Sequence, residues 1–351
     1  MEAELPRPLL ALEPEELALE VERGGGRPFH ARVLRQAMLE KGMLDYEQMT
    51  SLPASLRSHL KAHVPLLGSR VVESRRSPDR TTKLLLAFPR PGGGEDTVET
   101  VHIPPHSPDD DRGATLCVST QVGCPVGCPF CASGIGGLVR NLEPWEIVEQ
   151  YLRGRELGPL RRSVVMGIGE PLLNYSSLTA ALEVVTGEVG LGARKITVSS
   201  VGFPERLHRA ARSEPRFQLA ISLHSPFDGE RDELVPAMRG TPIEEVLEAG
   251  DDWFQVTGRE VTYEYVLLGG TNDDLEHADA LARRLRGRRC TVNLIPYNPT
   301  PELPYLRPDR GRPEAFRERL EEAGIVATVR WSRGLEGTAA CGQLRAGARS
   351  T

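Results

Sequence analysis

Three cysteines, Cys124, Cys128 and Cys131, stand in a CxxxCxxC run in the first half of the chain. Three thiolates at this spacing can ligate three irons of a cubane [4Fe-4S] cluster and leave the fourth iron without a protein ligand. A cluster that only carries electrons usually has four protein ligands. The spacing therefore indicates a cluster whose open iron binds a small molecule.

Structural zinc is the alternative for these thiolates. Together with Cys117, the three cysteines could supply a tetrahedral four-thiolate site. Zinc knuckles usually pair two CxxC-like turns across a longer loop, whereas all four cysteines here fall within residues 117–131. This crowding favours the iron–sulfur cluster.

The composition is that of an ordinary globular protein of 351 residues, with 39% hydrophobic and 26% charged residues. No apolar run is long enough to cross a membrane, and the acidic N-terminus lacks an apolar signal core. Six cysteines without a signal peptide favour a reducing compartment over a disulfide scaffold. We therefore expect a cytoplasmic protein, a monomer with no membrane partner.

The net charge of −6 disfavours a nucleic-acid partner at first sight, but the lysine and arginine residues are unevenly distributed along the chain. One basic group lies within residues 51–90 and a second within residues 283–289. Their members are Arg57, Lys61, Arg70, Arg75, Arg76, Arg80, Lys83 and Arg90, and then Arg283, Arg284, Arg286, Arg288 and Arg289. Such groups could neutralise phosphates or could be solvated arginines on helix faces. Charge alone leaves both interpretations open.

Residues 8–90 are predicted to be mostly helical, because apolar residues recur at three-to-four spacing in 31–41 and 46–63. Residues 81–103 then alternate apolar and polar side chains on both sides of a Pro-Gly-Gly-Gly turn at 91–94. This alternation predicts a β-hairpin.

From about residue 114 to 335, short apolar runs alternate with longer helical periods. The candidate strands are 115–118, 163–166, 195–198, 217–221, 261–266 and 291–295, and the candidate helices are 144–157, 178–189, 243–257 and 275–285. Alternating β and α units predict a parallel sheet with crossover helices. Six strands are too few for an eightfold barrel, so we predict an α/β fold with a partial (β/α)6 barrel. Its active residues should follow the C-terminal ends of the strands.

The chain resembles the RlmN/Cfr group of radical-SAM RNA methyltransferases over about residues 27–344. The matching blocks are CVSTQVGC at 117–124, CPFCASG at 128–134, RNL at 140–142, MGIGEPLLN at 166–174, SLH at 222–224, NLIPYNP at 293–299 and AACGQL at 339–344. Their number and order make the resemblance specific. It implies that S-adenosylmethionine binds the open iron and that RNA is the substrate.

The resemblance also implies how an electron-poor adenine carbon is methylated. The thiolate of Cys341 takes a methyl group from one S-adenosylmethionine by displacement. A second S-adenosylmethionine is cleaved at the cluster by an electron from a low-potential donor. The resulting radical removes hydrogen from the S-methyl group, and the carbon radical adds to the ring. Two S-adenosylmethionine molecules are thus expected per turnover.

The resemblance implies that two further residues are needed to complete the reaction and release the product. Cys117 would attack the carrier sulfur and leave a transient Cys117–Cys341 disulfide, and Glu99 would accept the ring proton. Without the resemblance, Cys117 would be interpreted as a buried free cysteine and Glu99 as a solvated strand residue. Cys290 is predicted to be a core cysteine.

The S-adenosylmethionine contacts are also carried over from the resemblance. They map to Gly169, Glu170, Ser199, Ser222, Leu223, His224 and Asn298. Glycine lets the backbone approach a ligand, and a carboxylate can accept from its ammonium group. A lone GxGE pattern is weak evidence, and the serines, His224 and Asn298 would otherwise pass as strand-end or turn residues.

The sequence departs from the family in two places. Leu335-Glu336-Gly337-Thr338 replaces the usual acidic, isoleucine-containing loop before Cys341, and no lysine-rich tail follows.

We predict four parts, namely an N-terminal helical accessory domain that binds RNA (1–80), a hairpin extension and linker (81–109), a radical-SAM core (110–335) and a loop that carries the methyl-accepting cysteine (336–351).

The expected function is methylation of adenine C2 in RNA, with 23S ribosomal RNA as the first candidate substrate and transfer RNA as the second. Methylation of C8 by the same mechanism is an alternative. A radical-SAM enzyme with a protein or small-molecule substrate would not need Cys117 and Cys341. A zinc-stabilised RNA-binding module without catalysis is the remaining alternative.

Overall fold

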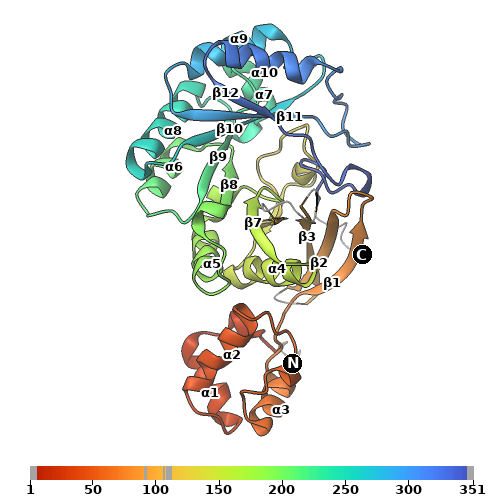
Figure 1. Cartoon of the computed structure of the whole chain (residues 1–351), viewed down its shortest axis with the longest axis vertical. Helices are drawn as coiled ribbons and strands as arrows, with labels where there is room; N and C mark the ends of the chain where they lie inside the picture. The colour runs from red at the N-terminus through yellow and green to blue at the C-terminus, as the bar shows by residue number, and fades with distance from the viewer. Residues whose placement is uncertain (1–5, 91–92, 106, 108–112, 346–351) are drawn as a thin grey trace.

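A mixed β-sheet runs through most of this computed structural model, which describes residues 6–90, 93–105, 107 and 113–345 (Figure 1). Its strands are β1 (Arg70–Arg76), β2 (Thr82–Pro89), β3 (Glu95–Ile103), β4 (Ala114–Cys117), β7 (Leu160–Val165), β8 (Ile196–Ser200), β9 (Gln218–Ser222), β10 (Val261–Leu267), β11 (Cys290–Pro296) and β12 (Val326–Val329). They lie across the sheet in this same order. From β4 to β12 all neighbours are parallel, whereas β1, β2 and β3 extend the sheet from β4 in antiparallel fashion.

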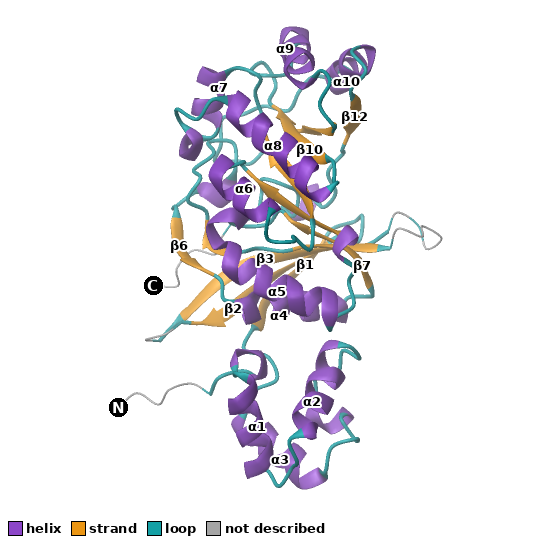
Figure 2. Ribbon diagram, turned by 90° about the vertical axis from the view of Figure 1, so that its left-hand side faces the viewer, coloured by secondary structure: helices purple, strands orange, loops and turns teal. Residues whose placement is uncertain are grey.

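Helices connect the parallel strands and lie alongside the sheet (Figure 2). They are α4 (Pro144–Glu156), α5 (Tyr175–Gly187), α6 (Pro204–Ala211), α7 (Asp228–Leu234), α8 (Ile243–Thr257), α9 (Leu275–Leu285) and α10 (Arg312–Glu322). Local sequence explains their ends: α4 begins with a proline in its first turn and a Glu143–Glu146 capping box. Gly258 ends α8 in the left-handed conformation.

The predicted α/β fold with a partial barrel is confirmed, and all six predicted strands are present. The strand β12 adds a seventh parallel strand that the sequence did not predict. It has only four residues, and two of them, Val326 and Thr328, are exposed. A short strand at the edge of a sheet lacks the continuous apolar run of its buried neighbours. The helices α6, α7 and α10 were likewise not predicted.

Three helices form a separate group at the N-terminal end of the molecule (Figure 1). They are α1 (Pro14–Arg23), α2 (Phe29–Leu39) and α3 (Ala54–His63), and their apolar faces bury Leu17, Leu34 and Leu56. The helical pattern predicted over residues 46–63 is confirmed for Ala54–His63, which form α3, but it is not one continuous helix. A 3-10 turn at Tyr46–Gln48 ends before Pro53, whose extended backbone precedes α3.

Arg70–Arg76 and Thr82–Pro89 are the strands β1 and β2, so the prediction that the mostly helical segment extends to residue 90 was wrong there. Every residue of β1 is exposed, so this strand shows no alternation of buried and exposed side chains. The hairpin of β2 and β3 is confirmed by their antiparallel register. Pro91 and Gly92 of its turn, and residues 106 and 108–112 of the loop that follows, lie outside the described residues. No helix in the described part of the chain is both long and apolar enough to cross a membrane.

Candidate active site

The cysteine run lies in a loop between two short strands, β5 (Gln121–Gly123) and β6 (Leu138–Asn141), which pair with each other. Gly123 has a φ of +76°, and a β-carbon there would lie 2.0 Å from the Gly137 carbonyl oxygen. Only glycine permits this close approach. The loop is therefore closed tightly at its base.

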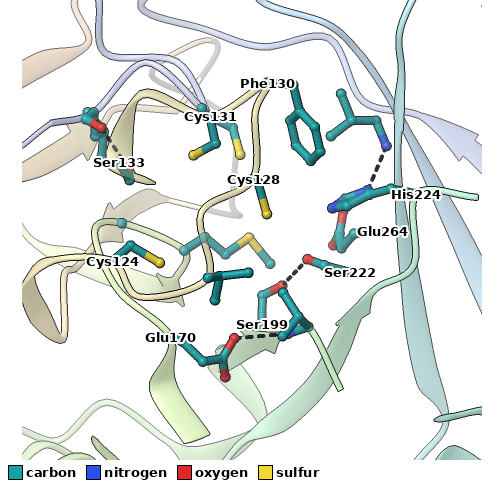
Figure 3. Close-up of a pocket in the computed structure, with 18 of the residues that line it drawn as sticks. Cys124, Cys128, Phe130, Cys131, Ser133, Glu170, Ser199, Ser222, His224 and Glu264 are labelled. Atoms are coloured by element: carbon teal, nitrogen blue, oxygen red, sulfur yellow. Dashed lines mark hydrogen bonds between the residues drawn. The ribbon is translucent and has the colours of Figure 1, made fainter. Parts of the chain in front are cut away.

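Cys124, Cys128 and Cys131 all line one pocket at the C-terminal edge of the parallel strands (Figure 3). Burial raises the pKa of the Cys124 thiol to about 12 and that of the Cys128 thiol well above its usual value, and it also raises the pKa of the Cys131 thiol. Three thiolates in this place therefore need a bound cation, which iron provides. The donor set fits a [4Fe-4S] cluster.

The geometry differs from that of a single-metal site. In the described part of the chain, no three His, Cys, Asp or Glu side chains converge as they would around one metal ion. A cubane places its three thiolates on three different irons and so needs them further apart. Cys117, the fourth ligand of the zinc alternative, lines a different pocket.

The C-terminal segment packs directly on the cysteine loop. Ala132 N–H donates to the Gly342 carbonyl at 2.8 Å, and the Ser133 hydroxyl donates to the Leu344 carbonyl at 2.6 Å. These bonds bring Cys341 to the wall of the pocket that the cluster cysteines line.

Most of the residues predicted to contact S-adenosylmethionine line this same pocket. They are Gly169, Glu170, Ser199, Ser222, His224 and Asn298. Leu223 does not: its side chain lies in the hydrophobic core, while its N–H donates to the Glu264 carbonyl at 3.0 Å. The Ser199 and Ser222 hydroxyls lie 3.3 Å apart at the ends of adjacent strands (Figure 3).

The loop after β7 is shaped by Gly169 and Glu170. Gly169 has a φ of +111°, and a β-carbon there would lie 2.7 Å from the Gln121 side chain. The Glu170 carboxylate accepts from Leu172 N–H at 2.9 Å and from Val201 N–H at 3.0 Å. Burial raises the pKa of Glu170, and these two bonds act in the opposite direction. Glu170 thus ties the loop after β7 to the loop after β8.

His224 lies two residues after the end of β9 and has a φ of +64°, a conformation that is uncommon for a residue other than glycine. Burial lowers its pKa to about 3, so the imidazole is neutral. Because its Nδ1 accepts from Val266 N–H at 3.1 Å, the proton resides on Nε2. The edge-to-face contact of its ring with Phe130, with centroids 5.1 Å apart, links β9 to the cysteine loop.

Among the buried oxygens of the pocket wall that have no hydrogen-bond partner in the described structure are one carboxylate oxygen and one amide oxygen. One is Oε2 of Glu264, whose other oxygen accepts from the Asn293 amide at 3.1 Å. The other is Oδ1 of Asn298, whose amide group donates to the Ser332 hydroxyl at 2.8 Å and to the Cys341 carbonyl at 3.0 Å. Buried acceptors without donors are costly. A ligand that carries ammonium and hydroxyl donors, such as S-adenosylmethionine, fits this wall.

Glu264 was not singled out in the sequence. It is the one acid in the strand Val261–Leu267, between two tyrosines, and it is 3% exposed. A carboxylate inside an apolar strand is unusual unless it is paired or functional, and that signal could have identified it.

A second pocket adjoins the first and contains Cys117 and Cys341 together. Cys341 lines both pockets, and Cys117 comes from the end of β4. Burial raises the pKa of the Cys117 thiol to about 11. Cys341 is exposed as a residue, but desolvation of its thiol by the pocket raises the pKa to about 12, and the Arg330 guanidinium opposes both shifts. Both cysteines are free thiols. Cys290 is partly buried and lines neither pocket.

Glu99 lies on β3 and lines neither pocket. Its carboxylate accepts from Arg345 N–H at 3.0 Å and lies 2.7 Å from the Lys83 ammonium. Burial raises the pKa of Glu99, and Lys83 acts against that shift. The structure therefore places Glu99 against the C-terminal segment rather than in the pocket wall.

The two basic groups of the sequence are partly paired with acids. In the second group, Arg284 pairs with Asp228, and Arg288 pairs with Glu244 and Asp251. In the first group, Arg57 and Lys61 both pair with Glu47, and Arg70 pairs with Glu95. These pairs reduce the charge that either group offers to phosphates.

Known proteins match this chain over nearly its whole length. Residues 118–303 match the Radical SAM superfamily. A protein of Synechococcus elongatus, named a probable dual-specificity RNA methyltransferase RlmN, is 43% identical over 98% of this chain and 94% of its own. A protein of Parasynechococcus marenigrum with the same name is 45% identical over 92% and 93% of the two chains.

A solved structure shares the fold. The crystal structure of a radical SAM methyltransferase from Sphaerobacter thermophilus is 42% identical and has a TM-score of 0.87, over 97% of this chain and 99% of that one. Radical SAM enzymes use a [4Fe-4S] cluster and S-adenosylmethionine, and the first pocket fits both. The chain belongs to the radical SAM superfamily and, within it, to the RlmN family of RNA methyltransferases.

Proposed function

We propose that this enzyme methylates C2 of an adenine in RNA by way of a methyl group carried on Cys341. One observation carries the proposal: Cys341 lines both the pocket of the cluster cysteines and the pocket of Cys117. A carrier must reach the methyl donor in one place and a resolving thiol in another. Relatives named dual-specificity RNA methyltransferases support more than one RNA substrate, for which 23S ribosomal RNA and transfer RNA are our candidates.

Cys124, Cys128 and Cys131 would hold the cluster, and the residues of the first pocket wall would hold S-adenosylmethionine. Bound there, these groups supply an electrophilic methyl group and, after one-electron reduction by an external donor, a hydrogen-abstracting carbon radical. The neutral His224 can donate from Nε2, while Glu264 Oε2 and Asn298 Oδ1 can accept from the ligand. Each turnover uses two molecules of S-adenosylmethionine.

The first chemical task of the chain is to form a thiolate at Cys341. Its surroundings disfavour the anion, and Arg330 opposes that effect. The thiolate attacks the methyl carbon, the sulfonium–carbon bond breaks, and Cys341 becomes a neutral S-methylcysteine. The carbon of this group, once it has lost a hydrogen atom, adds to the adenine ring. The ring radical formed in this way must then lose one electron, for which the oxidised cluster would be the acceptor, and its ring proton, so that a closed-shell thioether links Cys341 to the base.

The second task is to release the product. The Cys117 thiolate attacks the Cys341 sulfur, and the bond from that sulfur to the carbon breaks. Its electron pair stays on the carbon, and a proton completes the new methyl group. The two cysteines are left as a disulfide, which needs two electrons from a reductant before the next turnover.

Glu99 is our candidate for the base that accepts the ring proton. An ionised carboxylate is required for this role, and the neighbouring Lys83 favours ionisation. Because Glu99 lines neither pocket and its carboxylate accepts from Arg345 N–H, we expect the C-terminal segment to shift before proton transfer.

The test uses anaerobically reconstituted enzyme, S-adenosylmethionine with a fully deuterated methyl group, and RNA from a strain that lacks the modification. Mass spectrometry of the digested RNA should show 2-methyladenosine that has lost one deuterium and gained one proton. A methyl group with all its deuterium would contradict the carrier route. 8-Methyladenosine would support the alternative position, and a colourless zinc protein without iron would overturn the proposal.

A further inference from the structure

The second pocket contains cationic side chains, of which the proposed chemistry uses only Arg330, beside the Cys341 thiol. Among the described residues that line it are three arginines, Arg162, Arg330 and Arg333, and no Asp or Glu. A pocket lined by one sign of charge concentrates ligands of the opposite sign. We call this pocket, with Cys117 and Cys341 in its wall, the cationic pocket.

Two of the three arginines are available to a ligand. Arg333 is occupied by the protein, because its guanidinium donates to Asp79 and to the Pro104 carbonyl. Arg162 and Arg330 form no ion pair with any described residue. Arg162 is exposed, and Arg330 Nη1 lies 3.5 Å from the Met166 sulfur. Unlike Arg284 of α9, neither of these two cations forms an ion pair with a described acid, although Arg330 interacts electrostatically with Glu264.

A tryptophan stands beside these cations. Trp331 follows Arg330 directly, lines the cationic pocket and is 53% exposed. The Arg307 guanidinium lies 5.4 Å from the centre of its ring and adds another positive charge. An accessible aromatic ring among arginines is typical of surfaces that stack nucleobases.

The backbone around Trp331 is held on both sides. Arg330 N–H donates to the Leu294 carbonyl at 2.8 Å, and the Ser332 hydroxyl accepts from Asn298, whose amide also donates to the Cys341 carbonyl. The backbone that carries the ring is therefore held relative to the methyl-carrying cysteine. A rigid platform binds a base at a lower entropy cost than a mobile one.

We propose that Trp331, Arg162 and Arg330 form the binding site for the RNA strand that flanks the target adenine. This inference rests on the proposed function. The target base must leave its stack to reach Cys341, and the unstacked neighbouring base then stacks on Trp331. Arg162 and Arg330 contact the phosphates on that strand.

Steady-state kinetics on reconstituted enzyme test this site, together with equilibrium binding of RNA in the absence of S-adenosylmethionine. Trp331→Ala should raise the Kd and the KM for RNA about tenfold, as expected for loss of one stacked base. Trp331→Phe should retain most of the affinity but lose the RNA-dependent quenching of tryptophan fluorescence. Arg162→Ala should make the salt dependence of binding less steep.

Two measurements separate a binding defect from damage to the fold or the chemistry. Methylation of Cys341, followed by protein mass without RNA, should be unchanged in Trp331→Ala. Val326→Ala, at an exposed apolar residue of the adjoining β12, should leave RNA affinity unchanged.

The failures of the two proposals are distinguishable. If the wild type methylates Cys341 but no RNA, the proposed function fails. If the wild type methylates RNA and Trp331→Ala binds it equally well, the flanking-strand site is wrong. Competition by polyglutamate as effective as competition by RNA would also overturn it, since the pocket would then favour any polyanion.

Discussion

The Lys83 ammonium lies 2.7 Å from a carboxylate oxygen of Glu99, and both side chains are nearly buried. The same ammonium donates to the Thr338 carbonyl at 3.0 Å and to its hydroxyl at 2.9 Å. Thr338 precedes Cys341 by three residues. Lys83 therefore joins the candidate base to the loop that carries the methyl group.

Replacing Lys83 by methionine should reduce kcat about tenfold at neutral pH. Burial already raises the pKa of Glu99, and loss of the adjacent cation would raise it further, so the protonated, inactive form would persist to higher pH. The acid limb of the kcat–pH profile should move to higher pH in Lys83→Met and stay in place in Lys83→Arg. Lys61→Met, in an exposed pair with Glu47, is the control. If the acid limb stays in place in Lys83→Met, Lys83 does not control the pKa of the catalytic base.

Replacing Cys117 by alanine should trap RNA on the enzyme. Without a thiol to attack the Cys341 sulfur, the adduct cannot be resolved, and a nuclease-sensitive mass increase should remain on Cys341. The variant loses a buried thiol and should be destabilised by about 1 kcal/mol. Cys290→Ala, at a partly buried cysteine outside both pockets, is the matched control and should turn over normally. Multiple turnovers by Cys117→Ala would exclude the resolving role.

Replacing Gly169 by alanine should weaken S-adenosylmethionine binding. The new β-carbon would lie 2.7 Å from the Gln121 side chain at a φ of +111°, so the loop must move away from the ligand. A misplacement of this kind can also cost on the order of 100-fold in reaction rate. Isothermal titration of reconstituted enzyme would measure the change. Gly190→Ala has a comparable positive φ but no atom within 4 Å of the new β-carbon, so it should strain the backbone without affecting the ligand. Equal affinities in the two variants would refute the argument.

The stability of the core should depend on pH through His277. Burial alone would lower its pKa, but hydrogen bonds with Glu230 and Asp274 outweigh burial and raise the pKa to about 9. Because this exceeds the unfolded value of about 6.5, the stabilisation is fully present below about pH 6.5. It is lost as pH rises through about 9.

His277→Gln should therefore flatten the fall of Tm over this range. The contribution is on the order of 1–2 kcal/mol after allowance for solvent screening. His63→Gln, at an exposed residue at the end of α3, should keep the wild-type slope. An identical pH dependence in His277→Gln and the wild type would show that the pair with Glu230 does not stabilise the fold.

Local spacing accounts for what could be predicted about the fold. The CxxxCxxC run and the strand Val261–Leu267 are defined by residues close together in the chain, so they can be recognised without tertiary information. The exposed β1 and the four-residue β12 have no such local pattern. Each exists because a neighbouring strand provides its hydrogen bonds.

The features of the candidate site also divide into those that local sequence predicts and those that depend on the tertiary structure. The amino-acid sequence alone determined the three thiols of the cluster loop, the glycines that let backbone approach a ligand, and the membership of the chain in its family. Only the tertiary structure decided that Cys117 and Cys341 share a pocket, that Glu264 and Asn298 present unpaired oxygens, and that Arg162, Arg330 and Trp331 adjoin them. These residues lie on strands and loops far apart in the chain, and the register of the parallel strands brings them together at one edge of the sheet.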